Sequence, residues 1–350
     1  MQRLVMSAFF AVLPVLAEAD AVVGSWNVEH LGWNNGKRLD LVAHVANHFD
    51  LLAVQELMAP AALARLEAAL ETASGEAWSS LASHALGRTS YQEHYGFLWR
   101  EAEIDYLDGA VVFLDHGDVF AREPFSARFR DRGTGEAFVA ASVHVTYGDG
   151  VDDRLPEIAA LADYWRWLDE AHPGTPRLLM GDFNLPPDHA AWAPLRALGA
   201  VPAITDQATT LSTADGAYAS RYDNIWYRPD RLSPASLGVV RYPALVGLDH
   251  GQARDRVSDH APVYLALHGG ELARLTRDGE GLATALAAGC VDLNGGSVAD
   301  LETLPHIGPA RAAAIVAGRP WGDSGELTRL DGIAAGRLAE IRASGRLCGG

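Results

Sequence analysis

The sequence predicts an α/β domain followed by a small all-helical domain. Through most of the chain, short apolar runs rich in Val, Leu and Ile alternate with helical stretches, and Gly, Pro and Asp residues separate them. This alternation is typical of α/β domains. Beyond residue 290 the composition is helical throughout, and 350 residues are too many for one small core. We therefore expect one domain over residues 20–268, a linker helix over 269–289 and a second domain over 290–350.

The elements of the first domain can be placed in order. Runs with the length and composition of strands cover residues 21–28, 51–55, 95–100, 109–114, 138–144, 177–181, 223–227 and 263–267. Helical segments cover residues 38–47, 59–72, 156–171 and 190–198. Strands and helices therefore alternate along the chain, as an α/β domain requires.

The first 19 residues have the three parts of a secretory signal peptide. A positively charged start precedes the apolar run 4–16, and Ala17-Glu18-Ala19 gives a small-residue cleavage site. The apolar run is too short to span a bilayer as a helix, which needs roughly 20 residues. A buried first strand is the alternative, but residues 21–28 already supply one. We expect cleavage before Asp20 and export to the periplasm or the medium, with no membrane-bound part.

The two cysteines of the chain, Cys290 and Cys348, bracket the last segment. In an oxidising compartment, a pair that flanks a domain of this size predicts a disulfide. In the chain-entropy model such a bridge stabilises a small domain by about 4 kcal/mol. Two unpaired buried thiols are the alternative.

The chain is acidic, with a formal net charge of −17 and a pI near 5.1. A negatively charged body repels phosphate at long range. This charge excludes a protein that holds nucleic acid by bulk electrostatic attraction. A phosphate-containing substrate would have to be held by local groups and bound cations.

Polar side chains recur at the ends of the predicted strands. In layered α/β folds, strand ends meet solvent on a rigid scaffold, so such residues can converge on one cleft. Each of them alone is more often a capping or solvated residue, but their coincidence indicates a site. The set comprises Asn27, Gln55, Glu56, His144, Asp182, Asn184, Ser258, Asp259 and His260.

This set has the chemistry that phosphodiester cleavage requires. Carboxylate and amide oxygens such as those of Glu56, Asp259 and Asn27 suit a hard divalent cation. A water nucleophile needs a base, and the leaving oxygen needs an acid or a metal. His144 and His260 are available for proton transfer.

The order of motifs resembles the endonuclease/exonuclease/phosphatase superfamily from about residue 21 to residue 268. The motifs are SWNVEHLG, LLAVQEL, SVHVTY, MGDFN, RYDNIWY and SDHAPV. The resemblance implies a four-layer sandwich, with two packed mixed sheets flanked by helices. The stretch LGRTSYQEHYGFLWR is similar to the deoxyribonuclease I branch, which favours a nuclease over a phosphatase.

The resemblance also implies roles for individual residues. Glu56, with Asn27 and Asp259, would hold the divalent ion, expected to be magnesium, with manganese or calcium as alternatives. His260, oriented by Asp223, would activate water, and His144, paired with Glu93, would protonate the leaving oxygen or stabilise the phosphate. The opposite division of the acid and base roles between the two histidines is the alternative. Asp182 would orient the water or the metal shell, and Asn184 would bond a phosphate oxygen. Arg88 and Tyr91 would lie near the DNA backbone and minor groove.

The chain departs from the deoxyribonuclease I branch at two basic positions. That branch carries an arginine two residues after the first-strand Asn and another two residues after the metal-binding Glu. Here these positions are Glu29 and Met58. We expect fewer direct phosphate and minor-groove contacts from the catalytic face.

The segment VDLNGGSVADLETLPHIGPARAAAIVAGR resembles the helix-hairpin-helix domain of bacterial competence DNA receptors. Its turn would place Ile307 and Gly308 directly before a new helix. The free N–H groups at the start of that helix suit a phosphate, and Arg311 would add positive charge. Binding to the DNA backbone would be independent of sequence. A second hairpin at 330–334 has Ala334 where the motif usually has glycine. A helical protein–protein module is the alternative.

Taken together, the residues predict an exported, metal-dependent, monomeric endonuclease that cuts DNA with little sequence preference. A phosphatase or a phospholipase C-type phosphodiesterase of the same superfamily is the alternative, and it would use the same metal chemistry. A surface DNA-binding protein with an inactive nuclease fold is a third reading. The complete set of acids, amides and histidines disfavours it.

Overall fold

The computed structural model describes residues 21–33, 35–214, 216–267, 291–296, 298–302, 304–343 and 347. The predicted signal peptide, the linker helix and both cysteines lie outside these residues. Within them, no helix is long and apolar enough to cross a membrane.

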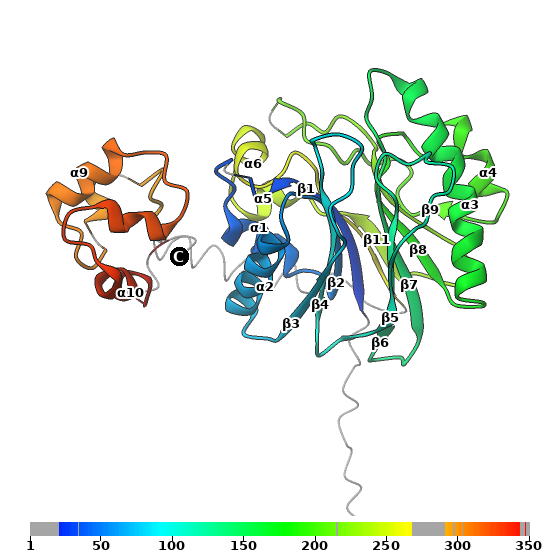
Figure 1. The fold of residues 1–350 in the computed structure, drawn as a ribbon, viewed down its shortest axis with the longest axis horizontal. Coiled ribbons are helices and arrows are strands. Elements are labelled where there is room, and N and C mark those ends of the chain that lie inside the picture. Colours follow the sequence, from blue (N-terminus) through cyan, green and yellow to red (C-terminus); the bar gives the residue numbers. More distant parts are fainter. Residues whose placement is uncertain are drawn as a thin grey trace, which may run out of the picture.

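Two six-stranded mixed sheets form the centre of the large domain (Figure 1). The first sheet has the strand order β11 (Ser236–Val239), β12 (Val263–Ala266), β1 (Val22–Leu31), β2 (Leu51–Leu57), β4 (His94–Arg100) and β3 (Trp78–Ala82). The second has the order β5 (Ile104–Val112), β6 (Phe125–Asp131), β7 (Ala137–His144), β8 (Arg177–Asp182), β10 (Asp223–Tyr227) and β9 (Val201–Pro202).

Helices cover the outer faces of both sheets, as Figure 1 shows. The first sheet packs on α1 (Leu39–Ala46) and α2 (Pro60–Ser74), with the short α5 (Tyr242–Leu245) and α6 (His250–Arg256) beside them. The second packs on α3 (Leu155–Ala171) and α4 (Ala193–Arg196). A third apolar cluster fills the space between the sheets. The predicted four-layer α/β sandwich is confirmed.

The strand pairing brings the predicted polar residues to one end of the two sheets. Strands β7 and β8 are parallel, so His144 lies opposite Asp182. Strand β10 runs antiparallel to β8, so its first residue, Asp223, also lies opposite Asp182. In the first sheet, parallel pairing of β1 and β2 sets Asn27 opposite Gln55. Register alone therefore gathers side chains that are far apart in the sequence.

Polar contacts join the two sheets beneath this end. The Gln55 side chain donates to the Ser142 hydroxyl at 2.9 Å, and the Tyr95 hydroxyl accepts the His144 N–H at 2.8 Å. All four residues are buried. Because unpaired polar groups in an apolar core are costly, these contacts fix the sheet-to-sheet alignment on which the site depends.

Gly181 of the Gly-Asp-Phe-Asn motif is required by close packing of β7 and β8. Its φ of +149° is unfavourable for other residues, and a Cβ atom would lie 1.9 Å from the Val143 carbonyl oxygen. Because Gly181 has no side chain, the backbone next to Asp182 can pack closely against β7.

Several elements differ from the sequence-based prediction. Strands β3, β6, β9 and β11 and helices α5 and α6 were not predicted, and the expected strand 109–114 is instead β5, which begins at Ile104. The segment 190–198 begins as the 3₁₀ turn Ala190–Trp192 before α4. The physical reason for the missed strands is that polar or charged residues interrupt their apolar pattern, as in the Phe-Ser-Ala-Arg-Phe-Arg-Asp sequence of β6.

The C-terminal region has its own apolar core among short helices. Helices α8 (Val298–Leu301), α9 (Pro309–Ala317) and α10 (Ala335–Ala343) and the 3₁₀ turn Ser324–Arg329 surround this core. The predicted hairpin turns precede α9 and α10. Val291 and Leu347 form a parallel bridge that closes the unit.

Candidate active site

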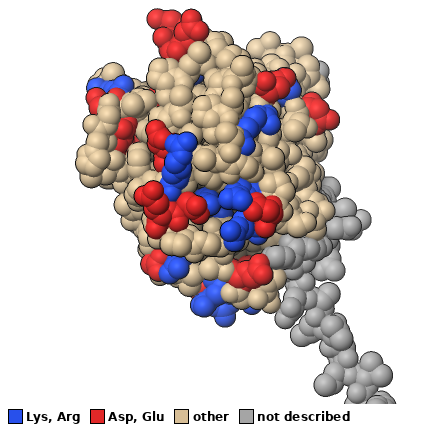
Figure 2. Space-filling model, turned by 90° about the vertical axis from the view of Figure 1, so that its right-hand side faces the viewer, with Lys and Arg blue, Asp and Glu red and all other residues tan. Residues whose placement is uncertain are grey.

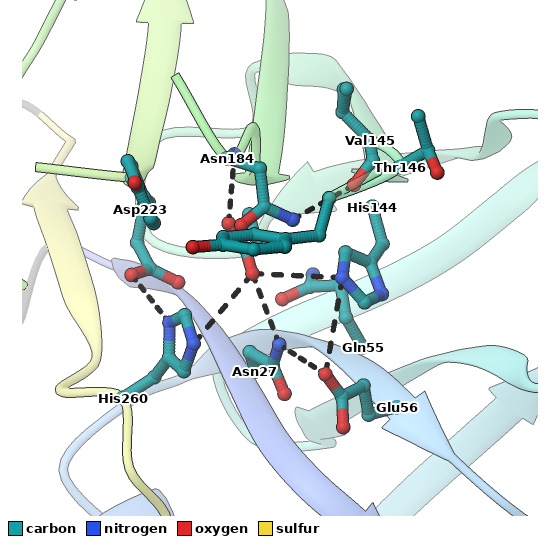
Figure 3. Close-up of polar contacts among 12 residues, drawn as sticks. Asn27, Gln55, Glu56, His144, Val145, Thr146, Asn184, Asp223 and His260 are labelled. Carbon is teal, nitrogen blue, oxygen red and sulfur yellow. Dashed lines mark hydrogen bonds and ion pairs between the residues drawn. The ribbon is translucent and has the colours of Figure 1, made fainter. Parts of the chain in front are cut away.

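A cleft of about 560 Å³ opens at the end of the two sheets where the polar residues gather. Figure 3 shows Asn27, Glu56, His144, Asn184, Asp223 and His260 directed toward a common centre. The cleft is lined by Glu56, Tyr91, Arg122, His144, Tyr147, Asp182, Asn184, Thr210, Leu211, Ala219, Ser220, Tyr222, Arg254, Asp259 and His260.

Asp182 is the centre of this arrangement. It is buried, and its Oδ1 accepts the Asn184 N–H at 2.9 Å. Its Oδ2 lies 3.2 Å from the Asn27 amide nitrogen, 3.6 Å from His144 Nε2 and 3.7 Å from His260 Nε2. Burial, and then repulsion from Asp223, raise its pKa even though His260 and His144 oppose the shift. One carboxylate thus faces both histidines.

Each histidine is held by a second carboxylate on its other ring nitrogen. His260 Nδ1 lies 2.8 Å from Asp223 Oδ2, and His144 Nδ1 lies 2.8 Å from Glu93 Oε1. Such contacts fix the orientation and tautomer of an imidazole and increase its basicity. Both Nε2 atoms are thereby directed into the cleft toward Asp182.

The electrostatic setting favours charge on both rings. Burial lowers the pKa of His260, but Asp223 and Asp182 outweigh this effect and hold the pKa well above its usual value. Burial and Arg122 lower the pKa of His144, while Glu93 and Asp182 give a net increase. Burial raises the pKa of Glu93, but the His144 ring and Arg122 outweigh burial, so the pKa of Glu93 is lowered overall. Each pair is therefore suited to holding a proton on the imidazole.

Glu56 enters the cleft from a bulge in the first sheet. The register between β2 and β4 shifts between Val54 and Leu57, and Glu56 has a left-handed φ of +57°. Its carboxylate accepts the Asn27 amide at 2.9 Å and the His30 N–H at 3.2 Å. The sequence-based placement of Glu56 beside Asn27 agrees with this geometry.

The donor set fits a divalent cation. Ligand atoms of Asp182, Asp223 and His260 all lie within 4.8 Å of one another. Asp223 Oδ1 is buried and has no hydrogen-bond partner among the described residues, which is unfavourable unless another group binds it. Buried carboxylate oxygens of this kind suit a hard ion. This group overlaps the His260–Asp223 pair, so a cation held there would prevent that pair from transferring a proton, whereas the predicted set of Glu56, Asn27 and Asp259 leaves the pair available.

The three residues predicted to bind the metal differ in their positions relative to the cleft. Glu56 and Asp259 line the cleft, and Asp259 Oδ1 lies 3.8 Å from His260 Nε2. Asn27 is buried, and its Oδ1 accepts the Glu29 N–H at 2.9 Å. Its amide therefore acts mainly as a link between Glu56 and Asp182.

Arg88 and Tyr91 have different surroundings. Tyr91 lines the cleft, and its hydroxyl donates to Glu93 Oε2 at 3.4 Å. Arg88 lies outside the cleft lining and pairs with Asp118 at 3.0 Å on an exposed loop. Tyr91 therefore lies in the cleft and Arg88 does not, and the predicted DNA contacts of both residues remain predictions.

The sequence interpretation missed the cations that brace the cleft. Arg122 donates to the His144 carbonyl at 3.1 and 3.0 Å, and Arg154 donates to the carbonyls of Tyr147, at 2.8 Å, and Asn184. Arg254 bonds the Leu211 carbonyl. These arginines come from loops and helix ends without a recognisable motif, so no signal in the sequence marks them.

Glu29 occupies one of the positions where the related branch has arginine. Its carboxylate accepts from Lys37 Nζ at 2.5 Å and from the Asp259 N–H at 3.1 Å. It therefore ties the loop after β1 to the strand-end segment that carries His260.

Charges on the face that carries α3 and α4 are interspersed, as Figure 2 shows. Ion pairs in and next to α3, such as Arg166–Asp163 and Arg177–Asp169, are in keeping with this pattern. Such paired charges give little net attraction for phosphate at a distance.

The C-terminal hairpins face a shallow groove of about 380 Å³ lined by Gly308, Pro309, Ala310, Arg311, Ala314, Leu330 and Asp331. Gly308 precedes α9, and the space where its side chain would be is open. Ile307 is buried in the apolar core. Arg311 donates to the carbonyls of Asp331 and His306 at 2.9 and 2.7 Å. It therefore braces one hairpin against the other.

Residues 24–260 match the model of the Endonuclease/Exonuclease/phosphatase family. The chain belongs to this family. The match covers most of both sheets and every residue of the two histidine–carboxylate pairs, while strand β12 lies beyond it. The enzyme is accordingly a phosphodiester hydrolase.

Two relatives extend the comparison. The chain is 48% identical to a "Deoxyribonuclease" of Thioalkalivibrio sp. (strain K90mix), over 99% of both chains. It is 28% identical to human "Deoxyribonuclease-1-like 2", over 76% of this chain and 97% of that protein. The first match includes the C-terminal region.

Solved structures share the fold at low identity. An endonuclease/exonuclease/phosphatase from Bacteroides vulgatus aligns with a TM-score of 0.53 and 18% identity, over 71% of this chain and 99% of that one. The mannosyl-6-phosphatase Bt3783 of Bacteroides thetaiotaomicron aligns with a TM-score of 0.52 and 19% identity, over the same shares. These likenesses concern the fold alone.

Proposed function

We propose that this chain is an exported, metal-dependent deoxyribonuclease that cuts DNA internally with little sequence preference. The observation that carries the proposal is the pair of buried histidines, His144 and His260, both facing Asp182 and each held at 2.8 Å by a second carboxylate. The likeness to the Thioalkalivibrio deoxyribonuclease over nearly the whole chain supports DNA as the substrate.

In this proposal the two histidines divide the proton transfers. The acids around His260 favour a charged ring, and a bound divalent cation would offset them, so that the neutral ring, held by Asp223, takes a proton from the attacking water at Nε2. His144, held by Glu93, carries a proton on Nε2 and delivers it to the leaving 3′ oxygen. Asp182, between them, stabilises whichever ring is charged. Asn184 donates to the Val145 carbonyl at 2.9 Å, and this contact fixes its side chain beside the phosphate position.

Magnesium is the proposed metal, with manganese or calcium as alternatives. Glu56 and Asp259, supported by Asn27, would hold it at the mouth of the cleft. When bound, the ion would neutralise charge on the phosphate and the leaving oxygen. The protein residues then have to position the water and move two protons, which the histidine pairs are arranged to do.

A plasmid assay tests this function. The protein with Mg²⁺ is expected to nick supercoiled plasmid, EDTA is expected to abolish nicking, and His260→Ala is expected to slow it at least about a hundredfold because the base is lost. His84→Ala changes an exposed histidine and serves as the control. Equal nicking by His260→Ala, or nicking in EDTA, would contradict the proposal. Metal-dependent release of phosphate from monoesters without nicking would favour the phosphatase alternative.

We further propose that the C-terminal region is a helix-hairpin-helix module that holds the DNA backbone. Support comes from the open N-terminus of α9 at Gly308, where free N–H groups and the positive end of the helix dipole suit a phosphate. Arg311 fixes the hairpin that presents them. The bridge between Val291 and Leu347 brings the two ends of the region together, and a disulfide between their chain neighbours Cys290 and Cys348 remains part of the proposal.

A change at Gly308 tests the module in the full-length protein. Gly308→Glu is expected to weaken binding of a long duplex about tenfold at low salt, because a carboxylate at the N-terminus of α9 repels phosphate. The backbone φ of −96° and the open space make the substitution compatible with the fold. Gly308→Ser is the matched control. Equal affinity and equal salt dependence of Gly308→Glu and Gly308→Ser would refute a backbone-binding role.

A further inference from the structure

An exposed aromatic cluster stands at the rim of the cleft. Trp33 follows β1, and its side chain is 52% exposed. Its ring stacks on His30, with centroids 4.3 Å apart and planes within 5° of parallel. Tyr91 meets both rings edge-on at 5.9 Å. A large aromatic side chain left in solvent beside an active site indicates a contact surface for a ligand.

The cluster is directly joined to the catalytic centre. His30 Nε2 lies 3.3 Å from Glu56 Oε2, and the His30 N–H donates to the same oxygen at 3.2 Å. Tyr91 donates to Glu93, the partner of His144. A single side chain, that of His30, therefore separates Trp33 from Glu56 in the cleft.

The backbone that carries the cluster is held in an uncommon conformation. Glu29 and His30 have left-handed φ values of +43° and +56°. Residues other than Gly, Asn and Asp rarely adopt this region, and a site that retains it is constrained by its surroundings. Here the contacts of Glu29 with Lys37 and with the Asp259 N–H supply the constraint. Trp33 is thus presented from a fixed turn.

The cations around this side of the cleft already have partners. Lys37 bonds Glu29, Arg122 bonds the His144 carbonyl, and Arg254 bonds the Leu211 carbonyl. The surface is acidic and these cations are already paired, so they offer a nucleotide little charge attraction. Stacking on an aromatic ring requires no charge and is the contact that remains for the nucleotide. Every base has a face that can stack, so such a contact tolerates any sequence.

We propose that Trp33, supported by His30 and Tyr91, is a stacking site for an unpaired base, which directs the enzyme to single-stranded or locally unpaired DNA. The inference rests on the proposed nuclease function and narrows its substrate. In a continuous duplex, neighbouring base pairs cover the base faces, so a ring at the rim gains a partner only from a base that is unpaired or turned out of the stack.

Cleavage selectivity is the first test. The measurement is kcat/KM for one 40-nucleotide sequence, single-stranded and as duplex, in Mg²⁺. Trp33→Ala is expected to lower the ratio of single-stranded to duplex kcat/KM about tenfold, a typical effect of losing one base–aromatic stack. Trp33→Phe, which keeps a ring, is expected to retain most of the ratio. Trp33→Leu, which keeps only apolar bulk, is expected to resemble Trp33→Ala.

Binding without cleavage is the second test. In EDTA, fluorescence anisotropy gives the affinity for a thymidine 12-mer and for an abasic 12-mer of the same charge. Removing the bases is expected to weaken binding to the wild-type protein about tenfold more than binding to Trp33→Ala, because both changes remove the same contact. Leu114→Ala, which alters a side chain that is 70% exposed and outside the cleft lining, is the control.

The outcomes separate the two proposals. If neither the wild type nor Leu114→Ala cuts any DNA, the nuclease function itself fails. If both cut DNA but Trp33→Ala keeps the wild-type ratio and the wild-type sensitivity to base removal, the stacking site is refuted and the nuclease stands. A ratio that falls equally in Trp33→Phe would also refute stacking.

Discussion

Replacing Asp182 with asparagine is expected to lower kcat on DNA about a thousandfold or more while leaving the fold intact. Asp182 Oδ2 faces the Nε2 atoms of both His144 and His260 and the amide of Asn27. An asparagine would remove the negative charge that stabilises each protonated ring, and its NH₂ group would meet other donors. Loss of one proton-transfer group typically costs about 10²–10⁴ in rate, and this change disturbs two.

The same substitution is expected to change thermal stability little, because two effects oppose each other. Burial and the nearby Asp223 raise the pKa of Asp182, so the charged form is disfavoured in the folded state relative to the unfolded chain, and a neutral isostere removes that penalty. The asparagine also removes the charge that stabilises the rings of His144 and His260. The measurements are single-turnover cleavage and the melting temperature of each variant. Asp188→Asn, at a carboxylate that is 66% exposed, is the control and should change neither. Full activity of Asp182→Asn, or its unfolding, would contradict this assignment.

The sequence predicted those strands whose apolar runs are uninterrupted. Strands β2, β7 and β8 are buried along almost their whole length, so their sequences are nearly continuous in Val, Leu and Ala. Strand β6 and the first part of β5 could not be recognised in this way. Asp105 and Asp108 of β5 pair with Arg130 and Arg128 of β6 on an exposed face. Cross-strand ion pairs thus replaced the apolar alternation on which the prediction depended.

The site was predicted more completely than its surroundings. The histidines and carboxylates lie in short motifs at strand ends, and register then brings them together. Arg122, Arg154 and Trp33 lie in connecting segments, whose path depends on tertiary contacts. The left-handed turn at Glu29 and His30 is an example, because its cause is the distant Asp259 N–H. Short motifs therefore located the histidines and carboxylates, whereas the residues of the connecting segments could be placed only from the structure.

Lowering the pH from 6.5 to 4.5 is expected to destabilise the protein by about 2 kcal/mol through His48 alone. His48 follows α1 and is 1% exposed, and neither ring nitrogen has a hydrogen-bond partner in the described structure. Burial first, and then His44 and Arg100, lower its pKa from 6.5 to about 4. The His44 ring lies 5.6 Å away.

The sign follows from proton uptake by the two states. Below pH 6.5 the unfolded chain binds a proton at His48, whereas the folded chain binds this proton only near pH 4. The stabilisation is therefore complete above the unfolded pKa and is lost as the pH falls toward the folded pKa. His48→Leu removes the titrating ring and its unpaired nitrogens while keeping an apolar side chain of similar size.

Urea unfolding at pH 8.0, 6.0 and 4.5 measures this effect. Wild type and His48→Leu are expected to differ little at pH 8.0, and the variant is expected to be more stable at pH 4.5 by about 2.5 kcal/mol. His84→Leu, at an exposed ring, should follow the wild-type pH dependence. Parallel curves for wild type and His48→Leu would show that the buried ring gains a partner on protonation. In that case the acid sensitivity of the fold would have to arise from other groups.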